Sequence, residues 1–419
     1  DPSDIQKAIA NWQQAIAATP ASYPELAMFL NNLGIGFRDL YSRTRDLSDL
    51  QNAITQWQQA VALTSPRSPD LAMYLNSLGN GLLAKYTHDG DAADLQKAIS
   101  VWQQAIAMTL PNSPERVARL NNLGNGLLAR YALTKNLDDL YSAQRNWEQC
   151  CRLGLDVAPA VVITASKSWG ASAAHLANWV EAIKAYTYGV QTIEQLFRTQ
   201  LWRTDKESWL REAQNLPTQL TYALARHGDL AAAVTTLDHE RTRLLIDALE
   251  RERSDLDLLP ARGYTDIYQH YRSIVCRIIQ LENARMHTEK LPPDFDAIAE
   301  LQLAQAELKH VIDQTRQLPG YEDFFESSTL EQIQYILAAQ NQVGVYLIAV
   351  QCGGLALIVH AEGVREVWLE FTEDELNDWL LNQTSESNTG GYLLAQLGDA
   401  SLESTLDELL PIIGERIML

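Results

Sequence analysis

The residue types best suited to chemistry in this 419-residue chain are its four cysteines and eight histidines. A cysteine peptidase needs a thiolate and an imidazole within hydrogen-bond reach of each other. Cys352 adjoins a predicted turn, whereas His360 lies at the end of the strand that follows it. At about 3.3 Å per residue, this strand separates the two by roughly 20 Å. The spacing therefore excludes Cys352 and His360 as a catalytic pair.

The other thiols and imidazoles show no spacing that is typical of a metal site. The cysteines form no CxxC motif, and the histidines are scattered along the chain. We therefore predict no metal site and no cofactor, with free thiols in a reducing compartment. Cys150 and Cys151 fall on a predicted helix, where one of them takes the small-residue place that Ala60 and Ala105 hold. Packing is the favoured interpretation of this pair.

Asparagines recur at one position of a repeated sequence and are the strongest candidates for a binding surface. Asn31, Asn76 and Asn121 are 45 residues apart, and Asn80 and Asn125 follow four residues later on the same helical face. Since asparagine can donate and accept hydrogen bonds, a ladder of them could hold the backbone of an extended peptide. For any single asparagine, a link between repeats or contact with solvent is the simpler explanation. For the set, we favour peptide binding in a groove.

The elements that carry these asparagines repeat with a period of 45 residues. Glycines recur with this period at Gly34, Gly79 and Gly124, and tryptophans at Trp12, Trp57, Trp102 and Trp147. A fixed period of this size predicts a solenoid of helical hairpins, in which each repeat buries its apolar face against its neighbours. Glycine inside a helix costs about 1 kcal/mol relative to alanine. We therefore expect a partner helix to approach closely at each glycine.

Each hairpin carries its own start signals and resembles a known repeat. The first helix is expected to begin at a proline (Pro24, Pro69, Pro114), and the second at a capping box such as Ser48 to Gln51. Leu30, Leu33, Gly34 and Phe37 resemble the W-x2-L-G-x2-Y signature of tetratricopeptide repeats, with leucine in the tryptophan position. The period is longer than the usual 34 residues, so both helices are expected to be extended.

Downstream of these repeats the pattern changes twice. We predict long repeats over 1–158, further tetratricopeptide-like repeats over 159–250, a helical hairpin spacer over 251–335 and a small α/β unit over 336–419. Within the last part, strands are expected at 343–350, 355–359 and 364–369, and a helix at 402–418. The predicted fold class is mainly α: a tetratricopeptide-like α-solenoid followed by the spacer and an incomplete α/β unit.

The order of these elements resembles the CHAT family, caspase-like domains associated with tetratricopeptide repeats. The residues that carry this resemblance are the segment 240–249, the spacer that ends at 318–324 and the hairpin with Cys352, Gly353 and Gly354. The resemblance implies a caspase-type cysteine peptidase whose repeats sense a protein partner, in bacterial defence or signalling. The catalytic histidine and cysteine of the family lie beyond the helix that matches 402–418. No residue here matches them, and we assign no catalytic residue.

Composition limits the partners that the chain is expected to bind. A net charge of −20 disfavours direct nucleic-acid binding, which depends on lysine and arginine. No apolar run is long enough to span a bilayer and no signal peptide precedes the first repeat, so we expect no membrane association and a cytoplasmic location. Because the chain begins with Asp1, we expect a fragment or a processed chain. The expected partners are a protein or peptide in the repeat groove and the catalytic part of the CHAT domain; the alternative is a non-catalytic peptide-binding adaptor.

Overall fold

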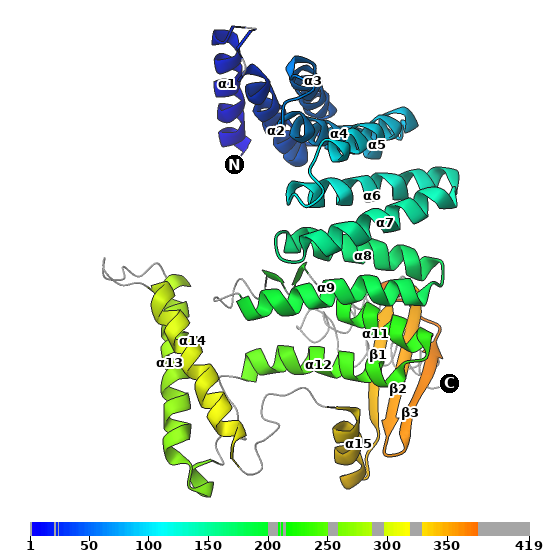
Figure 1. Cartoon of the computed structure of the whole chain (residues 1–419). Coiled ribbons are helices and arrows are strands. Elements are labelled where there is room, and N and C mark those ends of the chain that lie inside the picture. The colour runs from blue at the N-terminus through cyan, green and yellow to red at the C-terminus, as the bar shows by residue number, and fades with distance from the viewer. Residues whose placement is uncertain are drawn as a thin grey trace, which may run out of the picture. The chain divides into compact units, whose positions relative to one another are not determined.

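The computed structural model describes a mainly helical protein with one small three-stranded sheet (Figure 1). It covers residues 2–20, 22–23, 25–199, 208–209, 211–212, 215–249, 259–286, 297–318 and 329–375. The chain divides into two compact units, Asp1–Leu176 and Ala177–Leu419. The four-part division that the sequence suggested stays a prediction. The segment 402–418, where we expected a helix, lies outside the described residues.

The first unit consists of consecutive helices, each in contact with the next one along the chain. From α2 onward, the helices pair into hairpins of nearly equal length, as the 45-residue period requires. Their bounds are α1 (Pro2–Ala18), α2 (Leu26–Thr44), α3 (Leu47–Leu63), α4 (Leu71–Asp89), α5 (Ala92–Ala107), α6 (Glu115–Thr134), α7 (Leu137–Gly154) and α8 (Pro159–His175).

The core of the first unit is built around tryptophans that are pressed against helical glycines. Trp57, Trp102 and Trp147 are all fully buried. A methyl group added at Gly34 would lie 2.5 Å from Nε1 of Trp57, and one added at Gly81, on the next hairpin, would lie 2.5 Å from Cζ3 of the same ring. Each glycine therefore allows an indole ring to approach the helix backbone. The close approach expected at Gly34, Gly79 and Gly124 is confirmed, with a tryptophan ring as the group that approaches.

The second helix of the first hairpin begins two residues earlier than the sequence suggested. Asp46, rather than Ser48, is the N-cap of α3, and its carboxylate accepts a hydrogen bond from the Ser48 backbone N–H. Asp91 and Asn136 cap α5 and α7 in the same way. The capping box predicted at Ser48 is therefore wrong. Asp46, two residues upstream, accepts from the Ser48 backbone N–H, and the helix therefore begins at Leu47.

The second unit contains six described α-helices before and beside the sheet. α11 packs against both α9 and α12, and α13 packs against α14. The bounds are α9 (Trp179–Thr199), α11 (Leu216–His227), α12 (Leu230–Leu249), the 3-10 helix η2 (Pro260–Arg262), α13 (Thr265–Met286), α14 (Ala297–Arg316) and α15 (Leu330–Ala339). In the α13–α14 pair an apolar cluster that includes Tyr271, Ile274 and Val311 is buried. The two paired helices expected within 251–335 are confirmed, whereas their role as a spacer stays a prediction.

The sheet is an antiparallel meander of β1 (Gly344–Val350), β2 (Gly353–His360) and β3 (Gly363–Leu369). Gly344 pairs with Val359 and Val350 with Gly353, which leaves a two-residue turn at 351–352. The three strands predicted from the sequence are confirmed. β1 contacts α11, and β3 contacts α12. On β2, Leu355, Leu357 and Val359 are fully buried, so the sheet is anchored to the helices through its central strand.

Candidate partner-binding site

The five asparagines predicted to bind a partner do not share one environment. Asn31 on α2 and Asn121 on α6 are buried, with 3% and 8% of their surfaces exposed. The Oδ1 atoms of both are enclosed and accept no hydrogen bond from the described residues. A side chain in this position cannot reach a partner without movement of the helices. The carbonyl of Asn31 has a packing role instead, because it accepts a hydrogen bond of 3.2 Å from Nε1 of Trp57.

A sixth asparagine, which the sequence reasoning missed, links two neighbouring hairpins. Nδ2 of Asn122 on α6 donates to Oδ1 of Asn76 at 3.0 Å and to Oδ1 of Asn80 at 2.9 Å, both on α4. A link between repeats was the alternative explanation to peptide binding in a groove, and Asn76 and Asn80 form such a link. The preceding pair of hairpins cannot form it in the same way. Ser77 holds the place of Asn122 there, and its side chain is shorter.

Asn125 differs from the other four predicted residues. It is half-buried, and its side chain makes no hydrogen bond with any part of the chain that the structure describes. Its amide therefore keeps both a donor and an acceptor for another molecule. The groove hypothesis stays a prediction, and Asn125 is the residue on which it now mainly rests.

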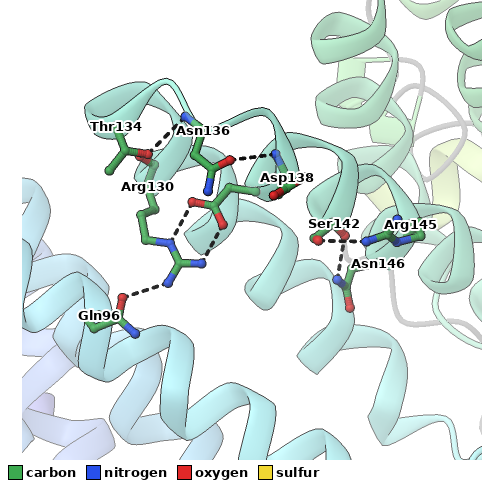
Figure 2. A network of polar contacts seen from close by, with 9 residues as sticks. Gln96, Arg130, Thr134, Asn136, Asp138, Ser142, Arg145 and Asn146 are labelled. Carbon is green, nitrogen blue, oxygen red and sulfur yellow. Dashed lines mark hydrogen bonds and ion pairs between the residues drawn. The ribbon is translucent and has the colours of Figure 1, made fainter.

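Partly buried ion pairs close the second and third hairpins at their turns. Arg130 on α6 donates through Nε and Nη2 to the two carboxylate oxygens of Asp139 on α7, at 2.8 and 2.6 Å. Figure 2 shows this fork, together with a further bond of 2.7 Å from Nη1 to Gln96 on the preceding hairpin. Lys85 and Asp94 form the equivalent pair between α4 and α5. The two ion pairs occupy equivalent positions, 45 residues apart in the sequence. This repetition is the signal that could have revealed them.

An open groove of about 390 Å³ lies between the first three helices. Its floor is apolar and comes from α2, whereas carboxamide side chains from α1 and α3 form much of its rim. The lining residues are Gln13, Ile16, Ala17, Leu30, Leu33, Phe37, Asn52, Gln56 and Gln59. The predicted asparagines are not among them. The groove is therefore separate from the predicted asparagine site.

The described thiols do not form a catalytic arrangement with an imidazole. Cys352 lies in the turn before β2 and His360 at the far end of that strand, where Nδ1 accepts a hydrogen bond of 3.3 Å from the Glu362 N–H. Partial burial raises the pKa of the Cys352 thiol, although the positive charge of Arg226 opposes this effect. On α7, Cys150 and Cys151 are fully buried. Burial raises the pKa of the Cys150 thiol to about 12.

Aromatic rings surround a cation where the hairpin of β1 and β2 meets α11. The Tyr222 hydroxyl donates to the Cys352 carbonyl at 3.3 Å, and Nη2 of Arg226 donates to the same hydroxyl oxygen at 2.8 Å. Cζ of Arg226 lies 3.9 Å from the centroid of the Trp368 ring on β3. These contacts couple the hairpin tip to α11. The sequence alone could not show them, because the residues are more than a hundred positions apart.

Within the described ranges, no group of three or more histidine, cysteine, aspartate or glutamate residues could hold a metal ion. No described helix is both long and apolar enough to cross a membrane. In comparisons with known proteins, no family model matches the chain, and no curated protein matches it significantly.

Proposed function

We propose that this chain is the sensor and scaffold part of a caspase-like cysteine peptidase that is regulated by tetratricopeptide-like repeats. A protein partner would bind along the repeats, in bacterial defence or signalling, and binding would control proteolysis. The observation that carries the proposal is the direct attachment of a small sheet to repeat-like helices. The tip of its first hairpin, Cys352 and Gly353, meets Tyr222 on α11. This order of elements is the one that resembles the CHAT family.

The contacts around α11 and α12 suggest a route between partner binding and the sheet. Tyr346 on β1 donates to the Asp238 carboxylate on α12 at 3.1 Å, and Asn215 beside α11 donates to Glu373 after β3. Each strand at the edge of the sheet is thus tied to the helical part. A shift of α11 or α12 would move the sheet with it. This coupling is what a sensor needs in order to act on a neighbouring domain.

Support for partner binding comes from the repeated face that bears the asparagines. Asn125 is half-buried and keeps its hydrogen-bonding capacity, and the hairpins around it are held rigidly by tryptophan and glycine contacts. A rigid helical face with unused amide groups suits recognition of an extended peptide backbone. Partner binding at this helical face is expected both for the sensor and for its alternative, a non-catalytic adaptor.

The coding sequence separates these two functions. The sensor proposal predicts a histidine at a strand end and a cysteine at the end of a later strand, both encoded downstream of residue 419. The protein that includes them should cleave a peptide substrate, and replacement of that cysteine by alanine should abolish cleavage. A downstream sequence without either residue would refute the sensor proposal and leave the adaptor.

The binding face is tested with one asparagine and a matched control. Asn125→Ala should weaken binding of a partner isolated with the wild-type protein about fivefold, since one net hydrogen bond contributes about 1 kcal/mol. Asn112→Ala removes an exposed loop asparagine and should leave the affinity unchanged. Equal affinities for the two variants, with unchanged thermal unfolding, would exclude the asparagine face as the binding site.

A further inference from the structure

The third hairpin departs from the repeat at two positions that are apolar in the first two. Arg116 on α6 takes the place of Leu26 and Leu71, and Arg119 takes the place of Phe29 and Tyr74. The earlier residues belong to apolar contacts; Tyr74, for example, packs with Leu26 and Leu30 in a buried cluster. Two positive charges therefore replace apolar side chains at a seam between hairpins. Such a substitution requires a compensating interaction, because the transfer of charge from water into a protein is costly.

Both guanidinium groups converge on one residue, Thr109, directly after α5. Nη1 of Arg116 donates to the carbonyl oxygens of Ile106 and Thr109, each at 2.9 Å. Nη1 of Arg119 donates to the Thr109 hydroxyl, which itself donates to the Ala105 carbonyl at 2.6 Å. Since Thr109 accepts from both arginines, the two cationic groups lie side by side.

No carboxylate among the described residues neutralises this pair by direct contact. Arg119 is 7% exposed, and burial lowers the pKa of its guanidinium. The charge of Glu115 acts on Arg119 without an ion pair, and the Glu115 carboxylate accepts a hydrogen bond from the Ser113 hydroxyl. Among the described residues, no carboxylate forms an ion pair with either arginine. The backbone carbonyls of Ile106 and Thr109 carry only partial charges. Of the two arginines, only Arg116 donates hydrogen bonds to them.

We propose that Arg116 and Arg119 form a binding site for an oxyanion, a carboxylate or phosphate group, at the seam between α5 and α6. An arginine presents donors in a planar fork that matches the oxygens of these groups, and two adjacent forks favour an anion over any neutral ligand. The two preceding seams, α1–α2 and α3–α4, retain the threonine as Thr19 and Thr64 but have apolar residues in place of the two arginines. They therefore serve as internal controls without the site. The inference is independent of the proposed function.

The repeat itself provides a test that preserves packing. In the double variant Arg116→Leu/Arg119→Tyr, the third seam receives the residues that the second seam already accommodates at Leu71 and Tyr74. The full chain is titrated with sodium phosphate and with sodium succinate at constant ionic strength, maintained with sodium chloride. Binding is measured by isothermal titration calorimetry, and the unfolding temperature by circular dichroism. Arg38→Gln, which removes an exposed arginine paired with Asp39, is the matched control.

The proposal predicts saturable binding of phosphate, succinate or both by the wild-type protein and by Arg38→Gln. The double variant should fold, and its affinity should be at least about tenfold lower, since one hydrogen bond to a charged group contributes roughly that factor. Binding of phosphate alone would identify a phosphate site, and binding of succinate alone a carboxylate site. Equal affinities in the wild type and the double variant, or no binding of either anion by the wild type, would overturn the proposal. Neither result would affect the proposed function.

Discussion

The contact between a helical glycine and a tryptophan ring leads to a prediction that two substitutions at one repeat position can decide. Gly36 and Gly81 are 45 residues apart, on α2 and α4. A methyl group at Gly81 would lie 2.5 Å from Cζ3 and 3.0 Å from Cε3 of the buried Trp57 ring. At Gly36 the nearest atom would be Cγ1 of Ile9, at 3.0 Å. The same substitution therefore meets a fixed ring in one case and a single aliphatic side chain of α1 in the other.

The magnitude for Gly81→Ala follows from three terms. Carbon atoms in contact lie about 3.5–4.0 Å apart, so the Trp57 ring must move by about 1 Å, and overpacking of this kind costs about 1–3 kcal/mol. The ring cannot move freely, because its other edge is pressed against Gly34. Movement also strains the hydrogen bond from Nε1 of Trp57 to the Asn31 carbonyl, which contributes about 1 kcal/mol. Alanine restores about 1 kcal/mol of helix propensity. The net destabilisation is about 1–3 kcal/mol.

Gly36→Ala should be neutral or stabilising by up to about 1 kcal/mol, because the propensity term is opposed only by a small shift of Ile9. Urea unfolding of both variants, followed by circular dichroism at 222 nm and by tryptophan fluorescence, measures the difference. The midpoint of Gly81→Ala should lie below that of the wild type, and that of Gly36→Ala at or above it. The reasoning is refuted if Gly81→Ala is as stable as Gly36→Ala.

Three further predictions concern other contacts. Asp139→Asn should lower the free energy of unfolding, measured with urea, by about 1–3 kcal/mol, because Arg130 loses a two-pronged bond to a buried carboxylate. The same change at the exposed neighbour, Asp138→Asn, is the control. Gly353→Ala should cost about 1–2 kcal/mol, since φ is +140° and the new methyl group would lie 3.1 Å from the Tyr222 hydroxyl; an unchanged unfolding temperature would contradict this. Ellman's reagent should titrate two thiols in the native protein and four in denaturant, because two cysteines are exposed and the adjacent pair on α7 is buried; modification of all four without denaturant would be inconsistent with that burial.

Much of the fold could be predicted because it depends on local patterns. The 45-residue period located the hairpins, and runs of β-branched and apolar residues around Gly353 and Gly354 located the strands. The start of α3 was misplaced because Ser48 and Asp46 are both residue types that favour the N-cap position. Only the backbone conformation decides which of them caps the helix, and in Asp46 it is extended.

The candidate site was less predictable because it depends on how helices are rotated against one another. Asn121 and Asn122 are adjacent, yet Asn121 is buried and Asn122 bonds to Asn76 on the preceding hairpin. A helical face can be predicted from spacing, but a rotation of a few tens of degrees decides which amide reaches a neighbour. The cationic pair on α6 was visible in the sequence as a break in the repeat. Its convergence on Thr109 could be known only from the structure.

The placement of Trp57 and Trp102 between glycines of two hairpins has a consequence for how this chain can change in length. Removal of residues 46–90 would join Arg45 to Asp91, an N-cap of the same kind as Asp46. Trp102 would then meet Gly34 in place of Gly79 and would keep its contact with Gly126. Both tryptophan–glycine contacts would be rebuilt from the same residue types, although Leu40 would take the place of Lys85 opposite Asp94. Insertions and deletions in whole units of 45 residues therefore preserve these tryptophan contacts, whereas other lengths shift the glycines away from the indole rings.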